Sequence, residues 1–296
     1  MSRHAWMLLL LLSFVWGASF LFIELALAVM GPVTLVFLRV LVGALCLLIY
    51  LRVRQKSLPL CLAFWAPVFV MGLLNNVVPF SLITYGQVFI TGGMASIINA
   101  NTAFFGVIVA ALFIADERLQ IRRLLGVMIG ISGVVIVVGP QNITDFNPTS
   151  IGQLAVVGAT LSYAFASVWA KLRLQGYDSE LIACGMLIAA SISMAPLMLW
   201  IEGLPHFEIN MELIGVFVGL GAIGTAFAYL LYFKILNITG ASNLMLVTII
   251  VPIFAVMLDA LVLSEFISFA DMVGFVIVAI GLAIMDGRLL RRQKTQ

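Results

Sequence analysis

An arginine and two acids stand inside long apolar stretches of the sequence, where a charged side chain is costly and is therefore a candidate for function. Arg39 lies near the centre of its apolar stretch, and Glu24 and Asp259 lie towards the ends of theirs. Two uses are open for Arg39: it could bind the carboxylate of a substrate, or it could pair with Glu24 or Asp259 and fix its own helix. Each acid could in turn be a charge or coupling group on an ion path, an interfacial acid, or the partner of Arg39.

Four asparagines lie near the middles of two other apolar stretches, at Asn75, Asn76, Asn99 and Asn101. Side-chain amides can bind both ends of a zwitterion without placing a net charge in an apolar medium. They can equally form hydrogen bonds between neighbouring helices, which is a common use of asparagine in membranes. Because residues one or two apart do not share a helix face, we expect at most one asparagine of each pair to face a cavity.

Two aromatic residues occupy corresponding positions in the middle of their stretches, Trp16 and Tyr163, 147 residues apart. Tryptophan and tyrosine usually gather at the ends of membrane helices, and that preference does not explain these two. They could form the wall or gate of a cavity, or they could be packing residues. Phe20, about one turn after Trp16, and Tyr229, near the end of a later stretch, are further candidates for a cavity wall.

The composition identifies the kind of element that carries these residues. Of 296 residues, 64% are hydrophobic and 9% are charged, with a mean hydropathy of +1.21. A soluble domain is roughly 45 to 50% apolar and about 25% charged, so we predict an all-α integral membrane protein. The three cysteines, Cys46, Cys61 and Cys184, lie in or beside apolar stretches, which indicates neither a disulfide framework nor a thiolate metal site.

A membrane-crossing helix needs about 20 apolar residues, and ten windows of this kind can be found. Their approximate bounds are 6–27, 32–51, 63–84, 92–114, 120–139, 151–171, 181–201, 212–233, 241–263 and 267–286. The first window follows Arg3 and His4, as the apolar part of a signal peptide would. It is longer than such a part and has no small-residue cleavage site, so we expect it to be retained as a helix.

The positions of the basic residues support ten spans. If the N-terminus is cytoplasmic, 14 of the 15 Lys and Arg residues fall in cytoplasmic segments, and Arg39 falls within a span. This bias is the one expected for cytoplasmic loops, and it would be lost if one helix were added or removed. Both termini are therefore predicted to be cytoplasmic.

Two segments 148 residues apart follow one pattern: an apolar run, a glutamate and then two glycines. The first is NTAFFGVIVAALFIADERLQIRRLLGVMIGISG at 101–133, and the second is IIVPIFAVMLDALVLSEFISFADMVGFVIVAIG at 249–281. The matched residues are Glu117 with Glu265, Gly126 with Gly274, and Gly133 with Gly281. This offset divides ten helices into two sets of five. Because five is odd, the second set must enter the membrane from the opposite side, which predicts an inverted repeat of the kind common in secondary transporters.

One short motif recurs at the end of each half: Asp116-Glu117 and Ser264-Glu265, each followed by a Gly-x6-Gly helix. Further motifs occur once: Ser13-Phe14-Val15-Trp16-Gly17 with Phe20, Pro32 with Arg39, and Pro252. Together they resemble the drug/metabolite transporter superfamily, EamA type, over essentially the whole chain. Length and number of spans are similar to the amino-acid exporters, including exporters of aromatic amino acids.

The resemblance implies a central cavity surrounded by spans one, three, four, six, eight and nine, with spans five and ten as scaffolds. The sequence departs from the pattern at one place, because Phe104 occupies the position that matches Pro252. We therefore expect a helix opened by proline only in the second half.

Other chemistries are not indicated. The two histidines, His4 and His206, lie near the predicted membrane surfaces, which argues against a haem or histidine zinc site within the membrane. The sequence has no Walker-type phosphate loop and no paired acids at a spacing suited to an intramembrane hydrolase. We expect no enzymatic activity, no cofactor, no metal and no nucleic-acid partner; the expected partners are a small-molecule substrate and the lipid bilayer.

The sequence thus predicts ten transmembrane helices as two inverted five-helix repeats, at 1–140 and 151–296, with a linker at 141–150 and a short basic tail. The favoured function is alternating-access export of small metabolites, above all amino acids, across the plasma membrane, which is the inner membrane of a bacterium. Two alternatives are open. An exporter of a lipophilic cation or a nucleotide sugar would carry a central acid or a basic cluster, and a non-transporting membrane subunit would carry a soluble domain or an interaction motif.

Overall fold

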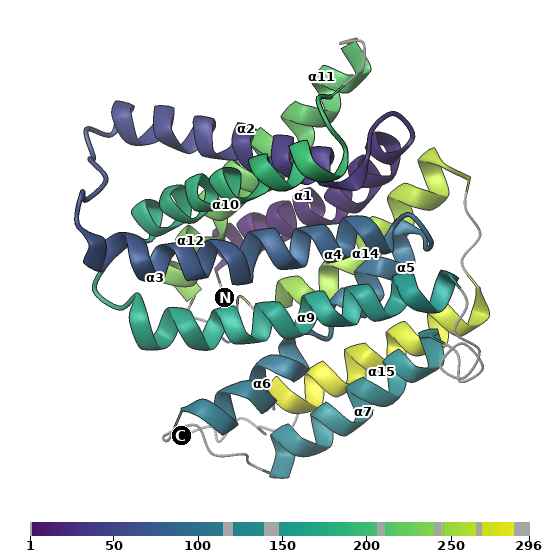
Figure 1. The fold of residues 1–296 in the computed structure, drawn as a ribbon. Coiled ribbons are helices and arrows are strands. Elements are labelled where there is room, and N and C mark those ends of the chain that lie inside the picture. The colour runs from purple at the N-terminus through teal and green to yellow at the C-terminus, as the bar shows by residue number, and fades with distance from the viewer. Residues whose placement is uncertain are drawn as a thin grey trace, which may run out of the picture.

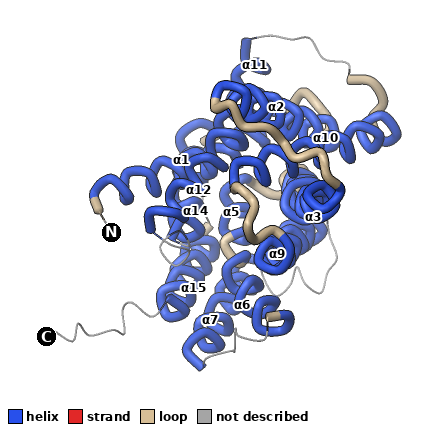
Figure 2. The backbone as a smooth tube through the Cα atoms, turned by 90° about the vertical axis from the view of Figure 1, so that its left-hand side faces the viewer, coloured by secondary structure: helices blue, strands red, loops and turns tan. Residues whose placement is uncertain are grey.

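The computed structural model describes residues 2–114, 121–138, 148–205, 211–239, 244, 246–264 and 268–286, and this part of the chain is helical without a β-strand (Figures 1 and 2). The α-helices are α1 (Arg3–Leu27), α2 (Pro32–Val53), α3 (Leu62–Gly72), α4 (Val78–Gly86), α5 (Gly92–Asn99), α6 (Thr102–Phe113), α7 (Ile121–Val138), α9 (Pro148–Arg173), α10 (Ser179–Ile201), α11 (Met211–Phe217), α12 (Ala228–Thr239), α14 (Leu246–Val262) and α15 (Phe269–Asp286). Two π-helices, η1 (Leu73–Val77) and η2 (Val218–Phe227), join α3 to α4 and α11 to α12. Glu117, Glu265, most of the expected linker and the basic tail lie outside the described residues.

Seven helical stretches within the described ranges are long and apolar enough to cross a membrane. They are Arg3–Leu27, Pro32–Val53, Leu62–Gly86, Gly92–Phe113, Ser150–Arg173, Ser179–Ile201 and Leu213–Thr239. Three further apolar helices are shorter, at Leu124–Val137, Leu246–Val262 and Phe269–Ile284. All ten coincide with windows expected from the sequence, and the helical, apolar character of those windows is confirmed.

Large apolar side chains lie on both faces of these helices. In α1, Leu9 and Leu12 are fully buried, whereas Leu10, Leu11 and Phe14 are exposed. Lipid tails are as apolar as leucine, so an outward leucine is stable there, and apolarity alone does not select which helices pack together. In membranes that choice is made by small residues, which allow close approach, and by polar contacts.

Glycines from both halves meet between α7 and α15, which lie side by side at the bottom of Figure 1. A Cβ atom added to Gly133 would lie 2.8 Å from the carbonyl oxygen of Gly274, and one added to Gly281 would lie 2.7 Å from that of Gly126. We call this contact the glycine seam. Residue numbers rise along α7 while they fall along α15, so the two helices are antiparallel. Matched helices of the two halves therefore run in opposite directions, as an inverted repeat requires.

The matched pair α2 and α10 is antiparallel as well, and polar contacts join it at both ends. The Glu202 carboxylate, directly after α10, accepts hydrogen bonds from the backbone N–H groups of Val33 (2.9 Å) and Thr34 (2.8 Å), at the start of α2. At the other end, Lys56 follows α2 and its Nζ lies 2.6 Å from Asp178 Oδ2, directly before α10. A carboxylate at a helix N-terminus satisfies N–H groups that have no partner within the helix.

The fourth expected span is interrupted in the first half, and this differs from the prediction. The helix is interrupted between α5 and α6, where the Asn101 N–H donates to the carbonyl oxygen of Ile98, three residues back, at 3.1 Å. The Asn101 side-chain amide donates to the same oxygen at 2.7 Å. In the second half, α14 continues through Pro252 without a break. The expectation that Pro252 opens its helix in the second half was therefore wrong, because membrane helices tolerate proline. The break in the first half has another cause, an asparagine side chain that competes for a backbone carbonyl.

The glycine seam predicts a specific sensitivity to added volume. Gly281→Ala is expected to reduce the free energy of unfolding by about 1–3 kcal/mol, the usual range for overpacking. Its Cβ would lie 2.6 Å from the Gly130 amide nitrogen and 2.7 Å from the Gly126 carbonyl oxygen, and neither backbone atom can move alone. The matched control is Gly106→Ala in α6, where an added Cβ meets nothing within 4 Å. It should be neutral or stabilising by up to about 1 kcal/mol. Thermal unfolding in detergent compares the two variants. Equal losses of stability would show that the glycine seam is not closely packed.

Candidate functional site

The hydroxyl of Tyr229, at the start of α12, is the centre of a polar network that joins the two halves of the chain. Asn75 donates to this hydroxyl through Nδ2 at 3.0 Å, and the hydroxyl donates to Asn76 Oδ1 at 2.8 Å. Asn75 Nδ2 also lies 3.8 Å from the Met186 sulfur of α10. The hydroxyl therefore acts as acceptor and donor at once, which fixes its orientation.

Both π-helices contribute to this network. Asn75 and Asn76 lie in η1, Thr225 lies in η2, and Tyr229 follows η2 by two residues. A π-helix closes bonds from i to i+5, is rare, and is frequent at functional sites. Its altered turn brings two neighbouring amides to one hydroxyl. Asn76 is fully buried and Asn75 is partly exposed, so Asn75 alone keeps an open side.

Arg39 of α2 lies beside this network, and an aromatic ring and a hydroxyl stabilise its charge. The residue is only 8% exposed. Its Cζ lies 3.9 Å from the centroid of the Phe80 ring in α4, and its Nε donates to Thr225 Oγ1 at 3.0 Å. The Thr225 hydroxyl in turn donates to the Leu220 carbonyl oxygen at 2.7 Å. That second bond leaves the hydroxyl oxygen free to accept from the arginine.

Within the described part of the chain, Arg39 has no carboxylate partner. Neither Glu24 nor Asp259 lies within ion-pair distance of its guanidinium, so the alternative in which Arg39 pairs with one of them is wrong. The two acids lie instead at the start of another helix, α5. A guanidinium stays charged at any physiological pH, so Arg39 keeps an unneutralised positive charge at this depth.

The three aromatic candidates other than Tyr229 lie in different surroundings. Tyr163 of α9 packs against both apolar clusters of the core and lies in the neighbourhood of Arg39. Trp16 of α1 is partly buried, with its ring centroid 5.9 Å from that of Tyr232 in α12. Phe20 is buried in the apolar core. Tyr163 thus belongs with the Arg39 network, whereas Phe20 is a packing residue.

Asn99 and Asn101 flank the break between α5 and α6. Asn101 is 1% exposed, and its Oδ1, like that of Asn99, is buried without a hydrogen-bond partner among the described residues. Gln153 of α9 is buried too, with its Nε2 3.3 Å from the Met94 sulfur and its Oε1 without a partner in the same residues. Asn99, Asn101 and Gln153 therefore each bury an amide oxygen that has no partner among the described residues.

Sequence analysis missed four residues that these contacts bring into the site region: Phe80, Gln87, Gln153 and Thr225. Each is a single uncharged residue within or beside an apolar span and belongs to no recognisable motif. The polarity of Gln87, Gln153 and Thr225 within such a stretch was the one available signal. Phe80 gave none, because phenylalanine is common in every span.

The two acids meet the first turn of α5. Glu24 Oε2 accepts a hydrogen bond from the Gly92 backbone N–H at 3.1 Å. Asp259 is 2% exposed, and its Oδ2 would lie 2.9 Å from a Cβ atom added to Gly92. Among the described residues, no three His, Cys, Asp or Glu side chains gather as metal ligands do.

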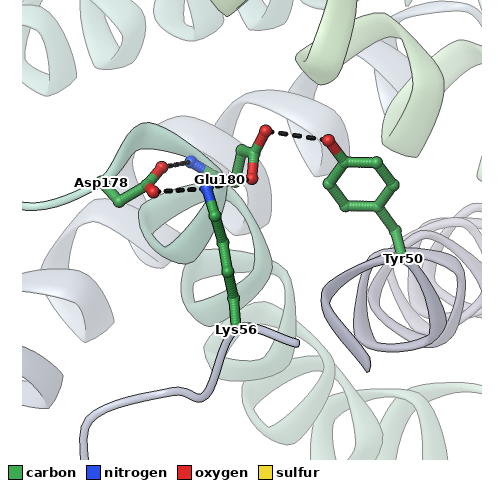
Figure 3. A network of polar contacts seen from close by, with 4 residues as sticks. All are labelled: Tyr50, Lys56, Asp178 and Glu180. Carbon is green, nitrogen blue, oxygen red and sulfur yellow. Dashed lines mark hydrogen bonds and ion pairs between the residues drawn. The ribbon is translucent and has the colours of Figure 1, made fainter. Parts of the chain in front are cut away.

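A network of charged and polar side chains joins the end of α2 to the start of α10 (Figure 3). Lys56 Nζ lies 2.6 Å from both Asp178 Oδ2 and Glu180 Oε2, and the Tyr50 hydroxyl donates to Glu180 Oε1 at 2.8 Å. The hydrogen bond between Lys56 and Asp178 raises the pKa of the Lys56 ammonium and lowers the pKa of the Asp178 carboxyl. Asp178 Oδ1 also accepts from the Glu180 N–H at 3.0 Å, which caps α10.

Comparison with known proteins gives a consistent result. The sequence profile of the EamA-like transporter family matches residues 4–139 and 150–285. The chain is 23% identical to the uncharacterized transporter YoaV of Bacillus subtilis, covering 94% of this chain and 95% of that protein. It is 25% identical to a probable amino-acid metabolite efflux pump of Salmonella typhimurium (96% and 95%) and 23% identical to one of Escherichia coli (96% and 95%). A crystal structure 20% identical in sequence covers 95% of this chain and 99% of its own with a TM-score of 0.65, which shows a shared fold.

The charged network predicts a pH-dependent contribution to stability. Because the folded-state pKa of Asp178 is depressed, its contribution is present above the ordinary value of 3.8 and is lost as the pH falls through the lowered value. At pH 7, Asp178→Asn should reduce the free energy of unfolding by about 0.2–1 kcal/mol, because the pair is partly exposed and screened. Asparagine can still cap α10, so capping is controlled. Thermal unfolding between pH 7 and 3 measures the difference from wild type, and a difference that does not shrink with acid would contradict the assignment.

The Tyr229 hydroxyl predicts a second effect. Tyr229→Phe removes the donor to Asn76 Oδ1 and leaves Asn75 Nδ2 only the Met186 sulfur. It should reduce the free energy of unfolding by about 1–3 kcal/mol, the usual penalty for an unsatisfied buried polar group. The matched control is Tyr232→Phe on the same helix, whose hydroxyl makes no hydrogen bond within the described residues. Thermal unfolding of both variants is the measurement. Similar losses would show that the network does not stabilise the fold.

Proposed function

The chain belongs to the EamA-like transporter family and is a multi-pass protein of the plasma membrane, and from this premise we propose that it exports amino acids from the cytoplasm by alternating access. Family profile matches over both halves and relatives named as transporters support the transport function. The substrate class is supported by two relatives named probable amino-acid metabolite efflux pumps and by the chemistry of the Arg39 network.

The proposal includes ten spans in two inverted halves, at 1–140 and 151–296, with both termini cytoplasmic. The three shorter apolar helices would complete the seven long ones. Antiparallel packing of α7 with α15 and of α2 with α10 supports the inversion. Because secondary transporters bind substrate at the interface of such halves, the site is sought where residues of both halves meet.

The observation that carries the substrate assignment is the unneutralised charge of Arg39. The one hydrogen bond of its guanidinium within the described residues uses Nε, so both Nη groups remain for a ligand. A carboxylate matches the fork of a guanidinium with two parallel hydrogen bonds. In this proposal the carboxylate of the amino acid supplies the anion that the protein itself does not provide.

The neighbouring residues suit the rest of such a substrate. The partly exposed Asn75 carries an amide oxygen, which can accept from an ammonium group without adding a second charge. Tyr163, Trp16 and Tyr232 offer ring surfaces to an apolar or aromatic side chain. Arg39 and Asn75 come from the first half, and Thr225 and Tyr229 from the second, so a bound substrate would contact groups that move relative to one another.

Alternating access needs places where helices can shift without losing hydrogen bonds. η1 and η2 occupy corresponding spans of the two halves, and each carries residues of the network. The glycine seam offers close backbone contact without interlocking side chains. In this mechanism the halves rock about the seam while the network exchanges protein contacts for substrate contacts.

A competition experiment tests the role of Arg39. Protein in liposomes should take up labelled phenylalanine, and unlabelled phenylalanine should compete far better than phenethylamine, which lacks the carboxylate. Arg39→Met should weaken phenylalanine binding by about 10- to 100-fold, the value of hydrogen bonds to a charged group, and should abolish the preference over phenethylamine. Arg39→Lys, which keeps the charge but not the fork, should retain part of both.

Two results would contradict the proposal. Equal competition by phenethylamine in the wild-type protein would show that the carboxylate is not recognised. Transport of lipophilic cations or nucleotide sugars, with no amino-acid flux, would replace the substrate class while leaving family membership unchanged. Size-exclusion profiles in detergent distinguish loss of binding from loss of folding in the variants.

A further inference from the structure

The carboxylate of Asp259 is buried against the first turn of α5. The residue lies in α14 and is 2% exposed. Neither of its oxygens makes a hydrogen bond of normal geometry in the described part of the chain, although the Gly93 N–H group is close enough to stabilise the carboxylate. Its Oδ2 would lie 2.9 Å from a Cβ atom added to Gly92 and 3.3 Å from one added to Gly93. Two successive glycines therefore allow this carboxylate to reach the start of the helix.

A second carboxylate lies at the same helix start. Glu24 of α1 accepts a hydrogen bond from the Gly92 N–H at 3.1 Å, and Thr91 caps the helix by accepting from the Met94 N–H at 3.3 Å. Glu24 is also the charged group that interacts electrostatically with Asp259. Two acids from different helices thus converge on one turn of α5.

The surroundings of Gly92 contain more buried hydrogen-bond acceptors than donors. Gln87 donates through Nε2 to the Phe20 carbonyl oxygen at 2.9 Å, which fixes the orientation of its amide, and its Oε1 has no partner among the described residues. The same Nε2 would lie 3.3 Å from a Cβ atom on Gly92, so Gln87 borders the same glycine as Asp259. Buried acceptors are normally paired with donors. One proton on a carboxyl turns an acceptor into a donor and begins to remove the excess.

The surroundings favour a proton over a metal cation. Among the described residues no third His, Cys, Asp or Glu joins the two carboxylates as a metal ligand would. The partial positive charge at the start of α5 stabilises an ionised carboxylate, and the Gly92 N–H provides this for Glu24. Two close carboxylates in a buried place retain one proton between them. The elements packed against α14 are α1, α5 and α15. Apart from Glu24, the titratable residues of these helices are Arg3 and His4 at the far end of α1, and Asp271 and the terminal Asp286 of α15. The Asp271 carboxylate accepts a hydrogen bond from Ser268.

We propose that Glu24 and Asp259 bind one shared proton when α1, α5 and α14 pack as they do here, and that releasing it is linked to opening of this end of the carrier. The link follows from position, because α1 and α5 belong to the first half and α14 to the second. With both acids ionised, a second negative charge would lie between the halves. Separation of the halves would let water reach that charge. Coupling to substrate rests on the proposed function, whereas proton binding does not.

Infrared spectroscopy of the purified protein tests proton binding without any substrate. The wild-type spectrum should contain the carbonyl stretch of a protonated carboxylic acid at neutral pH, and raising the pH should remove it with release of about one proton per chain. Asp259→Asn should lack this band. Glu24→Gln removes the neighbouring charge, so the band should disappear at a lower pH than in wild type. Asp271→Asn is the matched control and should behave as wild type.

Absence of the band in the wild-type protein, or its persistence in Asp259→Asn, would overturn the proton site. If Asp259→Asn is not monodisperse in detergent, Glu24→Gln decides, because an unshifted pH for loss of its band would overturn the pairing. Removal of the band by sodium at constant pH would identify a metal cation as the ligand and would equally overturn the proposal.

Transport in liposomes tests the coupling. A pH gradient should drive accumulation of labelled phenylalanine by the wild-type protein, and Asp259→Asn should retain exchange of phenylalanine while losing that accumulation. Gradient-driven accumulation by Asp259→Asn at the wild-type level would overturn the coupling. If the wild-type protein moves no amino acid, the proposed substrate is wrong, and the infrared result still decides whether the proton site exists.

Discussion

The permanent charge of Arg39 at membrane depth is the constraint around which the centre of this protein is arranged. A guanidinium cannot lose its proton in a protein, so its surroundings must stabilise it. Phe80 supplies a ring face, Thr225 supplies an oxygen, and the phenol of Tyr163 is near. These groups come from α4, η2 and α9, so stabilising one charge brings helices of both halves together. No carboxylate of the described residues completes the set, and the anionic ligand proposed above would do so.

The rest of the fold follows the rule that helices in lipid are joined by small residues and polar contacts rather than by apolar burial. The glycine seam joins α7 to α15 through backbone contact. The pair α2 and α10 is held at its two ends, by Glu202 on the start of α2 and by Lys56 at the start of α10. Both pairs join matched helices of the two halves. The molecule therefore has strong contacts at its margins and adaptable ones, the π-helices and the broken fourth span, nearer the centre.

Particular residues show where sequence reasoning succeeded and where it stopped. Hydropathy located the helical windows, and the offset of 148 residues singled out Gly126, Gly133, Gly274 and Gly281. These glycines do meet, but Gly133 lies against Gly274 and Gly281 against Gly126 rather than in the matched pairs, because the two helices are antiparallel. Nothing in the sequence indicated that Asn75 and Asn76 would meet the same hydroxyl, because the π-helix that brings both amides to Tyr229 leaves no periodic pattern. Reasoning from proline alone failed at the fourth span, where Asn101 and not a proline marks the break. Local bonding between a side chain and the backbone leaves no periodic signal in a sequence.

The sequence by itself determined the class of protein, the helical windows, the repeat and the small set of polar residues from which a site can be built, because each of these is a property of composition, period or spacing. Tertiary structure alone decided which of those residues meet. Arg39 contacts Phe80 and Thr225 rather than an acid, and Asp259 meets Glu24 at the start of α5. A lipid-exposed face and a buried face have the same apolarity, so the sequence of a membrane helix does not record its neighbours, and pairing of charges across helices is fixed only when the helices pack.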